Sequence, residues 1–309
     1  MCGLFGFTTY GNSKNNFTEL LQALACNSAE RGTHASGISY NHNGKLITYK
    51  KAISGVRLKP LHFNGVQTIT GHTRHATQGN YKLNYNNHPF DGIVGGTPIA
   101  MAHNGVIYND TELRRKYKLK SGQIQTDSYI YMQLLERQKK LDFDGIKTAT
   151  EDLEGYYTFT ILDSKNNLYF VKGDSPLSIV HIPALKIYIY ASTDEILYTS
   201  LMQCDLFKHI KQNNFADIPI AEGDILKIDN NGKISKGKFE PYKIVNTFNF
   251  RKWYEYDEPE ELEPLDEYTQ LVIDIAEYAG YSADDIQELI DSGYTLEDIE
   301  EYIYTGELY

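Results

Sequence analysis

The stretch MCGLFGFTTYG, residues 1–11, decides how this chain is interpreted. Gly3 and Gly6 interrupt an apolar and β-branched run, which predicts a strand whose small residues lie against a close neighbour. Cys2 becomes the first residue if Met1 is removed. A terminal cysteine combines a thiol nucleophile with an α-amine of pKa about 7.7–8.0, which can accept the thiol proton. Taken alone, a cysteine at position 2 is more often incidental than catalytic.

Length and composition predict a large domain with a small appendage. The chain has 309 residues, of which 41% are hydrophobic, enough for one sizeable core. The cysteines Cys2, Cys26 and Cys204 are too widely spaced to indicate a disulfide framework or a zinc site. The sequence has no apolar run of about 20 residues and no secretion signal. We therefore expect a soluble, cytoplasmic protein that does not bind membranes.

Charge divides the chain into two parts. Residues 255–309 contain 19 acidic residues and no lysine or arginine, whereas residues 1–254 hold 30 basic and 22 acidic residues. A charged, proline-containing linker separates them, so we assign a domain to residues 1–245 and an acidic linker with a small helical tail to residues 246–309. This balance argues against nucleic acid as a partner, and the acidic tail could meet a basic partner or cover part of the body.

The tail contains a short repeat, in which GYSADDIQELI begins at Gly280 and GYTLEDIEEYI at Gly293. Ser282 and Thr295 are expected helix N-caps, each followed by acidic residues in the first turn. Together with the preceding stretch, the repeat predicts three short helices. A small bundle packed on the body and a docking module are equally compatible with it.

The body alternates short strands and turns with a few helices, which predicts an α+β fold with antiparallel sheets. Asn43-Gly44 marks a hairpin turn, and the stretch PIAMAHNGVIYN predicts a strand followed by a turn. Thr126 is a possible N-cap of the helix in TDSYIYMQLLERQ. The chain lacks phosphate-loop, dinucleotide-binding and nucleophile-elbow motifs and a complete calcium loop, so no cofactor or metal is expected.

Three further stretches could bind a substrate beside Cys2. In GHTRHATQG, Arg74 offers a two-pronged donor for a carboxylate, with the Thr77 hydroxyl nearby. Asn104-Gly105 pairs a side-chain amide with an unhindered N–H, as an oxyanion hole requires. Asp127 could hold an ammonium group. Each has a simpler explanation as an exposed strand arginine, a hairpin turn or a capping acid, but together they fit free glutamine.

These stretches resemble the class II glutamine amidotransferases, whose glutaminase domains are N-terminal-nucleophile hydrolases. The matching segments occur in family order and span about residues 2–235: MCGLFGF, ERGTHASGI, GHTRHATQG, NNHPF, AHNGVIYN, TDSYI, LEGYYTFTILD, KGDSPLSI and ASTDEIL. Each segment is modest, but the ordered set is highly specific. The resemblance implies a four-layer αββα sandwich made of two antiparallel sheets faced by helices.

The resemblance also implies roles for individual residues. Cys2 corresponds to the nucleophile, and Asn104 and Gly105 correspond to the oxyanion-hole pair. Glutamine would be bound by residues matching the family's carboxylate and ammonium contacts, namely Arg74, Thr77 and Asp127. Supporting positions near the nucleophile are Arg31, Gly32 and Gln78.

Two stretches depart from the family pattern. The segment after Arg74 has His75 and Gln78 where many relatives have tryptophan and histidine, and His34 replaces an acidic residue in the RGTHASG loop. The departures bear on how a covering loop or partner domain communicates with the site. They also prevent the acceptor from being inferred from loop identity.

The expected activity is hydrolysis of glutamine to glutamate and ammonia, with ammonia passed to a separate synthase or other acceptor protein. The acidic tail is the candidate contact with that partner. Two alternatives stay open at this point. One is a γ-glutamyl amide or peptide hydrolase on the same scaffold, and the other is a non-catalytic interaction protein. The candidate site residues present in the sequence speak against the second alternative.

Overall fold

The computed structural model divides into two units, Met1–Lys243 and Ile244–Tyr309. In the first unit it describes residues 2–11, 13, 15–58, 65–120, 122–208, 210 and 214–243, and in the second unit residues 272, 295, 296, 298 and 299. The fold and the site below are those of the first unit. The domain boundary given above stays a prediction.

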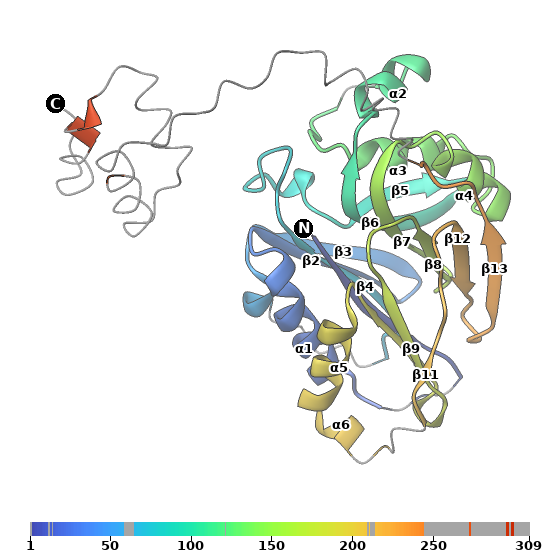
Figure 1. Cartoon of the computed structure of the whole chain (residues 1–309). Coiled ribbons are helices and arrows are strands. Elements are labelled where there is room, and N and C mark those ends of the chain that lie inside the picture. The colour runs from blue at the N-terminus through green and yellow to red at the C-terminus, as the bar shows by residue number, and fades with distance from the viewer. Residues whose placement is uncertain are drawn as a thin grey trace, which may run out of the picture. The chain divides into compact units, whose positions relative to one another are not determined.

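Two antiparallel sheets form the centre of this unit (Figure 1). The seven-stranded sheet A has the order β11 (Ala216–Asp217), β9 (Ser178–Ile182), β10 (Ile187–Ala191), β1 (Gly3–Thr9), β4 (Thr68–Arg74), β2 (Ala35–His42) and β3 (Lys45–Lys51). The six-stranded sheet B has the order β13 (Ile234–Lys238), β12 (Asp224–Ile228), β8 (Leu168–Lys172), β7 (Gly155–Asp163), β6 (Thr97–Ile107) and β5 (Phe90–Val94).

Helices cover the outer face of each sheet. The α-helices are α1 (Thr18–Ser28), α2 (Asp110–Lys116), α3 (Tyr129–Glu136), α4 (Phe143–Thr150), α5 (Asp194–Gln203) and α6 (Asp205–Lys208). Short 3₁₀ turns lie at Ala29–Arg31, Gly55–Arg57, Asn84–Asn86 and Pro183–Leu185. Helices α1 and α5 contact each other and strands of sheet A, while α3 and α4 contact strands of sheet B. The expected αββα sandwich is confirmed.

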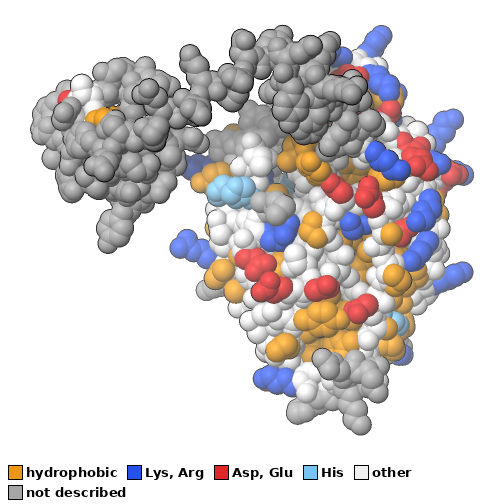
Figure 2. All heavy atoms as spheres, viewed as in Figure 1, with side chains coloured by type: hydrophobic (Ala, Val, Ile, Leu, Met, Phe, Trp, Pro, Cys, Tyr) orange, Lys and Arg blue, Asp and Glu red, His pale blue; other side chains and the backbone are white. Residues whose placement is uncertain are grey.

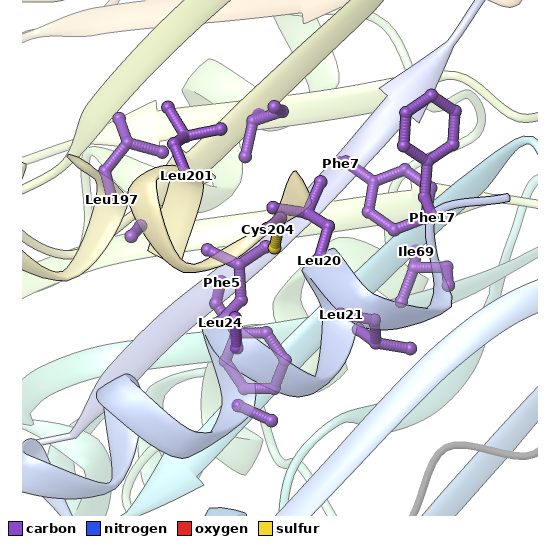
Figure 3. Close-up of a cluster of buried hydrophobic side chains, with 14 of the residues drawn as sticks. Phe5, Phe7, Phe17, Leu20, Leu21, Leu24, Ile69, Leu197, Leu201 and Cys204 are labelled. Atoms are coloured by element: carbon purple, nitrogen blue, oxygen red, sulfur yellow. The ribbon is translucent and has the colours of Figure 1, made fainter. Parts of the chain in front are cut away.

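Three apolar clusters correspond to the three interfaces between these layers. Sheet A packs on α1 and α5 through residues such as Phe5, Leu24 and Leu197, whose side chains converge in Figure 3. A second cluster joins sheet B to α3 and α4, and a third, including Leu4 and Phe170, lies between the two sheets. Apolar burial at about 25 cal/mol per Å² therefore holds all four layers together.

Strand β1 lies in the middle of sheet A and pairs with β10 and β4. All seven of its residues are buried, and its two glycines allow the close approach that the sequence predicted. A Cβ on Gly6 would lie 2.2 Å from the Ile69 carbonyl oxygen, and the φ of Gly6 is +155°. Cys2 therefore sits at the head of a fixed central strand.

The hairpin at Asn43-Gly44 is confirmed, because β2 and β3 pair across it and both residues have positive φ. The strand and following turn predicted in PIAMAHNGVIYN are confirmed, because β6 ends at Ile107, but Asn104-Gly105 lies within the strand and is not a hairpin turn. Pairing with β7 keeps this segment extended, and Gly105 reaches a φ of +142° that other residues avoid.

The capping prediction for Thr126 was wrong. Helix α3 begins two residues after Asp127, and its N-cap is Ser128, whose side chain makes no capping hydrogen bond. The Thr126 hydroxyl is buried and has no hydrogen-bond partner among the residues that the structure describes. Helix α3 is held by its buried apolar side chains, packed against sheet B, rather than by a cap.

The described residues of the second unit include one predicted helix N-cap, Thr295. The backbone N–H of Asp298 donates to Thr295 Oγ1 at 3.2 Å, and that of Thr295 donates to Asp298 Oδ2 at 2.9 Å. This reciprocal pair satisfies two otherwise unpaired donors, so the predicted N-cap at Thr295 is confirmed. The rest of the predicted three-helix tail, including the cap at Ser282, lies outside the described residues.

Charges of both signs are interspersed on the face of the protein that Figure 2 shows, with exposed hydrophobic side chains between them. Ion pairs such as Lys116–Asp152, at 2.6 Å, and Lys147–Glu151, at 3.7 Å, join opposite charges at the surface. Pairs of this kind contribute at most about 1 kcal/mol each. Within the described residues, no helix is long and apolar enough to cross a membrane.

Candidate active site

A cavity of about 320 Å³ lies beside Cys2 and is lined from both sheets. From sheet A and the segment after β4 come Cys2, His75 and Thr77. From sheet B come Asn104, Gly105, Val106 and Tyr156, and the segment after β8 adds Asp174, Ser175 and Pro176. The structure thus brings four of the predicted residues, Cys2, Thr77, Asn104 and Gly105, to one cavity.

The Cys2 thiol lies at the meeting point of several segments. Its Sγ is 3.5 Å from the His75 carbonyl oxygen, and its own carbonyl accepts a 2.8 Å hydrogen bond from Arg31 Nε. Burial raises the pKa of the Cys2 thiol, while the positive charge of Arg74 acts in the opposite direction. A neutral thiol is therefore favoured, and a base is needed to generate the nucleophilic thiolate.

Across the cavity, Asn104 presents a donor with no acceptor. The residue is 1% exposed, and Nδ2 has no hydrogen-bond partner among the described residues. A buried donor without a partner costs about 1–3 kcal/mol. Next to it, a Cβ on Gly105 would lie 1.9 Å from the Tyr156 carbonyl oxygen, so only glycine fits there. The pair can stabilise an oxyanion formed beside Cys2.

Arg74 is buried below the cavity rather than lining it. Its guanidinium donates to Asn87 Oδ1 at 2.7 Å, to the Gly79 carbonyl at 3.1 Å, and also to the Gln78 carbonyl. Burial lowers the pKa of Arg74, and the nearby Cys2 and Asp127 oppose this. The arginine thus holds the segment that follows β4 in place, and these bonds use three of its five N–H donors.

Asp127 is also buried and away from the cavity lining. Its Oδ2 accepts a 2.7 Å hydrogen bond from the Ile107 N–H, and its Oδ1 accepts from Ser128 Oγ at 3.3 Å. The backbone N–H of Asp127 donates to Gln78 Oε1 at 3.0 Å. Gln78 therefore connects the Arg74 and Asp127 positions, a link that the sequence did not indicate.

The loop before β2 supports the same segment. His34 donates its backbone N–H to the Arg74 carbonyl at 3.1 Å, and its Nδ1 accepts from the Ala76 N–H at 2.9 Å. Its ring stacks on His75 and on Tyr81. A Cβ on Gly32 would lie 2.3 Å from the Arg74 carbonyl carbon, so the loop needs glycine there. The histidine that replaces the family's acid thus fixes the residues after Arg74.

Three buried histidines join the sheets beneath the site, and the sequence analysis assigned them no role. His72 Nε2 is 2.8 Å from the His103 carbonyl oxygen, and His103 Nδ1 is 2.7 Å from Ser128 Oγ. The His88 ring packs against that of His72 in a tilted arrangement, with centroids 4.3 Å apart, and its ring nitrogens have no partner among the described residues. Burial lowers the pKa of His72 to about 3 and holds that of His88 well below its usual value. All three favour the neutral form.

Two stretches quoted for the resemblance contain cavity residues that the sequence analysis missed. Tyr156 comes from LEGYYTFTILD, and Asp174 and Ser175 come from KGDSPLSI. These residues lie within segments that carry the family resemblance, and this was the sequence signal that could have identified them. Among the residues described, no group of three or more His, Cys, Asp or Glu is arranged to hold a metal ion.

Comparison with known proteins points to a family. Residues 72–199 match the family described as a glutamine amidotransferase domain. An isomerizing glutamine–fructose-6-phosphate aminotransferase of Staphylococcus epidermidis is 32% identical over 190 residues, which is 58% of this chain and 30% of the relative. That of Listeria monocytogenes is 34% identical over 189 residues, with the same coverage. The chain thus spans about a third of the length of these relatives.

The fold has a counterpart among solved structures. The glutamine phosphoribosylpyrophosphate amidotransferase from B. subtilis superposes with a TM-score of 0.60 over 77% of this chain and 49% of that chain, at 21% identity. At this identity the likeness concerns the fold, and it matches the sandwich described above. The sequence matches thus show homology to glutamine amidotransferases over the matched region, and the structural match shows the fold.

Proposed function

We propose that this protein hydrolyses the side-chain amide of glutamine, with Cys2 as the nucleophile once Met1 has been removed. The observation that carries the proposal is the pairing of Cys2 with the unpartnered Asn104 Nδ2 across one cavity. A buried donor left without an acceptor is unfavourable in the resting protein. It becomes favourable when an oxyanion forms in front of it, which is the requirement of acyl transfer.

The remaining predicted residues fit the two ends of glutamine. We assign Arg74 and Thr77 to the α-carboxylate and Asp127 to the α-ammonium group. Arg74 and Asp127 act in opposite directions on the pKa of Cys2, and Cys2 and Asp127 both oppose the lowering of the Arg74 pKa by burial, which supports their proximity. Arg74 already donates to Gln78 and Gly79, so the glutamine carboxylate would bind through its remaining N–H donors or replace these acceptors.

The proposed reaction has two halves. The α-amine of Cys2 takes the thiol proton, and sulfur adds to the amide carbon while Asn104 Nδ2 and the Gly105 N–H stabilise the oxyanion. The C–N bond then breaks, and ammonia leaves with the transferred proton. Water adds to the resulting glutamyl thioester by the same path, the C–S bond breaks, and glutamate and the free thiol are released.

Glutamine turnover combined with intact mass tests this proposal. Protein that begins at Cys2 should release glutamate and ammonia in equal amounts, and Cys2→Ala should abolish release. Cys26→Ala is the matched control, because Cys26 is another free cysteine and is exposed. Turnover that survives Cys2→Ala, or that requires retained Met1, would contradict the proposal.

We further propose that the ammonia reaches a separate acceptor protein. The relatives named above are aminotransferases of fructose 6-phosphate, and this chain matches 30% of their length. A binding partner should raise turnover and reduce the free ammonia released per glutamate. A constant one-to-one ratio with every protein recovered from the native host would favour simple hydrolysis. The acidic tail as the contact and a cytoplasmic location remain predictions.

A further inference from the structure

The proposed mechanism leaves one wall of the cavity beside Cys2 without an assigned role. The proposed mechanism uses Cys2, Asn104 and Gly105, whereas Tyr156 and Asp174 also line the cavity. Ammonia is a small leaving group that needs no such wall. A polar, aromatic surface beside the scissile bond therefore raises the question of what it contacts.

The Asp174 carboxylate is held in place on one side only. Its Oδ1 accepts a 3.1 Å hydrogen bond from the Tyr157 backbone N–H, which orients the group. Its Oδ2 has no hydrogen bond, and the carboxylate has no ion pair within 4 Å, among the residues described. The nearby Lys172 donates instead to the Gly173 carbonyl at 2.8 Å. An oriented, unpaired carboxylate beside a cavity is suited to a cation.

Two tyrosines add to the attraction for a cation. The Tyr108 and Tyr156 rings pack edge to face, with centroids 5.7 Å apart, and the side chains remain 52% and 43% exposed. Aromatic faces attract ammonium and guanidinium groups, by about 0.5–1 kcal/mol at exposed sites. Asp174 also lies close enough to Tyr108 to contribute to raising its pKa, after the larger effect of burial.

We propose that Tyr156 and Asp174 form a subsite for a cationic leaving group, so that the protein also hydrolyses γ-glutamyl amides of aliphatic diamines. The proposal rests on the proposed function, because it places the glutamyl group on Cys2. The nitrogen in the scissile amide is uncharged, so the cation must be the second amine. The C–S bond forms, the C–N bond breaks, and the diamine leaves with the thiol proton in place of ammonia.

The test compares two amides of equal size. Wild-type protein and Asp174→Asn are assayed with the γ-glutamyl monoamide of putrescine and with the γ-glutamyl amide of n-pentylamine, its neutral counterpart. The side-chain oxygen of asparagine can still accept the hydrogen bond from the Tyr157 backbone N–H. The wild type should prefer the charged amide by about tenfold in kcat/KM, and Asp174→Asn should reduce this ratio to about one. Glu222→Gln, a neighbouring acid outside the cavity lining, should keep the ratio.

Two results would overturn the subsite. One is equal use of both amides by the wild type. The other is an equal loss in Asp174→Asn for charged amide, neutral amide and glutamine, which would assign Asp174 to the α-ammonium group. A binding measurement separates this proposal from the catalytic one. Putrescine should bind the Cys2→Ala protein more tightly than neutral 1,4-butanediol does, and Asp174→Asn should remove the difference; equal binding of the two compounds would refute the subsite even if no hydrolysis occurs.

Discussion

The two sheets prepare their polar groups for substrate in opposite ways. Arg74, at the end of β4 in sheet A, makes three hydrogen bonds within the protein. Asn104, on β6 in sheet B, leaves its Nδ2 without a partner among the described residues. Both side chains are at least 97% buried, so exposure does not explain the contrast.

The difference follows from when each charge is present. The α-carboxylate that we assign to Arg74 exists before the reaction, so binding can exchange one set of acceptors for another. The oxyanion that we assign to Asn104 exists only during the reaction. A donor already paired in the resting protein would lose that bond at the moment of catalysis, which reduces its benefit. Sheet A therefore supplies donors that are already paired within the protein, and sheet B supplies a donor that is unpaired among the described residues.

The largest effect on catalysis is expected from replacing Asn104. Asn104→Leu should lower kcat by about 10²–10³, equivalent to about 2.7–4 kcal/mol of transition-state stabilisation. It should not lower the free energy of unfolding by a comparable amount, because Nδ2 has no hydrogen bond to lose. Steady-state kinetics and urea unfolding measure the two quantities. A large loss of stability with little change in kcat would reverse the assignment of roles between the sheets.

The opposite pattern is expected for the arginine. Arg74→Met keeps much of the side-chain length but leaves buried acceptors at Asn87 and Gly79 without their donor. Each unsatisfied buried acceptor costs about 1–3 kcal/mol, so the free energy of unfolding should fall, and KM for glutamine should rise. A variant as stable as the wild type would show that these bonds do not organise the site.

The histidines that join the sheets predict a pH dependence of stability. The pKa of His88 is lowered on folding, so below pH 6.5 the unfolded chain binds a proton that the folded protein does not. The contribution of His88 to the free energy of unfolding is therefore fully present above about pH 6.5. It decreases by about 1.4 kcal/mol for each pH unit below that value. His88→Phe should flatten the decline between pH 7 and pH 5. An unchanged slope in urea unfolding would contradict this.

The smallest effect is expected at the link between the Arg74 and Asp127 positions. Gln78→Met removes the acceptor for the Asp127 N–H while the backbone contact to Arg74 can persist. One neutral hydrogen bond is worth about 0.5–1.5 kcal/mol, so kcat/KM should fall by roughly tenfold or less. Lys82→Met, at an exposed position in the same segment and outside the cavity lining, provides a comparison for general disturbance. A loss larger than that of Arg74→Met would make Gln78 a principal binding residue.

Much of the architecture could be predicted from local pattern. The glycine spacing predicted the strand β1, and Asn43-Gly44 predicted the β2–β3 hairpin. Both predictions succeeded because they depend on local backbone conformation. Asn104-Gly105 has the same local signal as a turn, yet pairing with β7 makes it part of a strand. The Thr126 cap failed for a related reason, since packing of α3 outweighs capping.

The sequence predicted several residues that share one cavity, but it did not predict how they are arranged. Cys2, Thr77, Asn104 and Gly105 share a cavity, but no local pattern indicated that Arg74 and Asp127 lie behind its wall. Their partners come from segments distant in sequence: Asn87 is 13 residues from Arg74, and Gln78 is 49 residues from Asp127. Such contacts depend on tertiary packing. The same holds for Asp174, whose orientation comes from the backbone of β7.

The place of Cys2 at the head of the middle strand of sheet A has a practical consequence for recombinant work. Strand β1 is buried along its whole length and paired on both sides, so the residue preceding Gly3 is fixed beside the cavity. A purification tag fused ahead of Cys2 would convert its amine into an amide and crowd the cavity mouth. Affinity handles therefore belong at the other end of the gene, or behind a protease site whose cleavage leaves cysteine as the first residue.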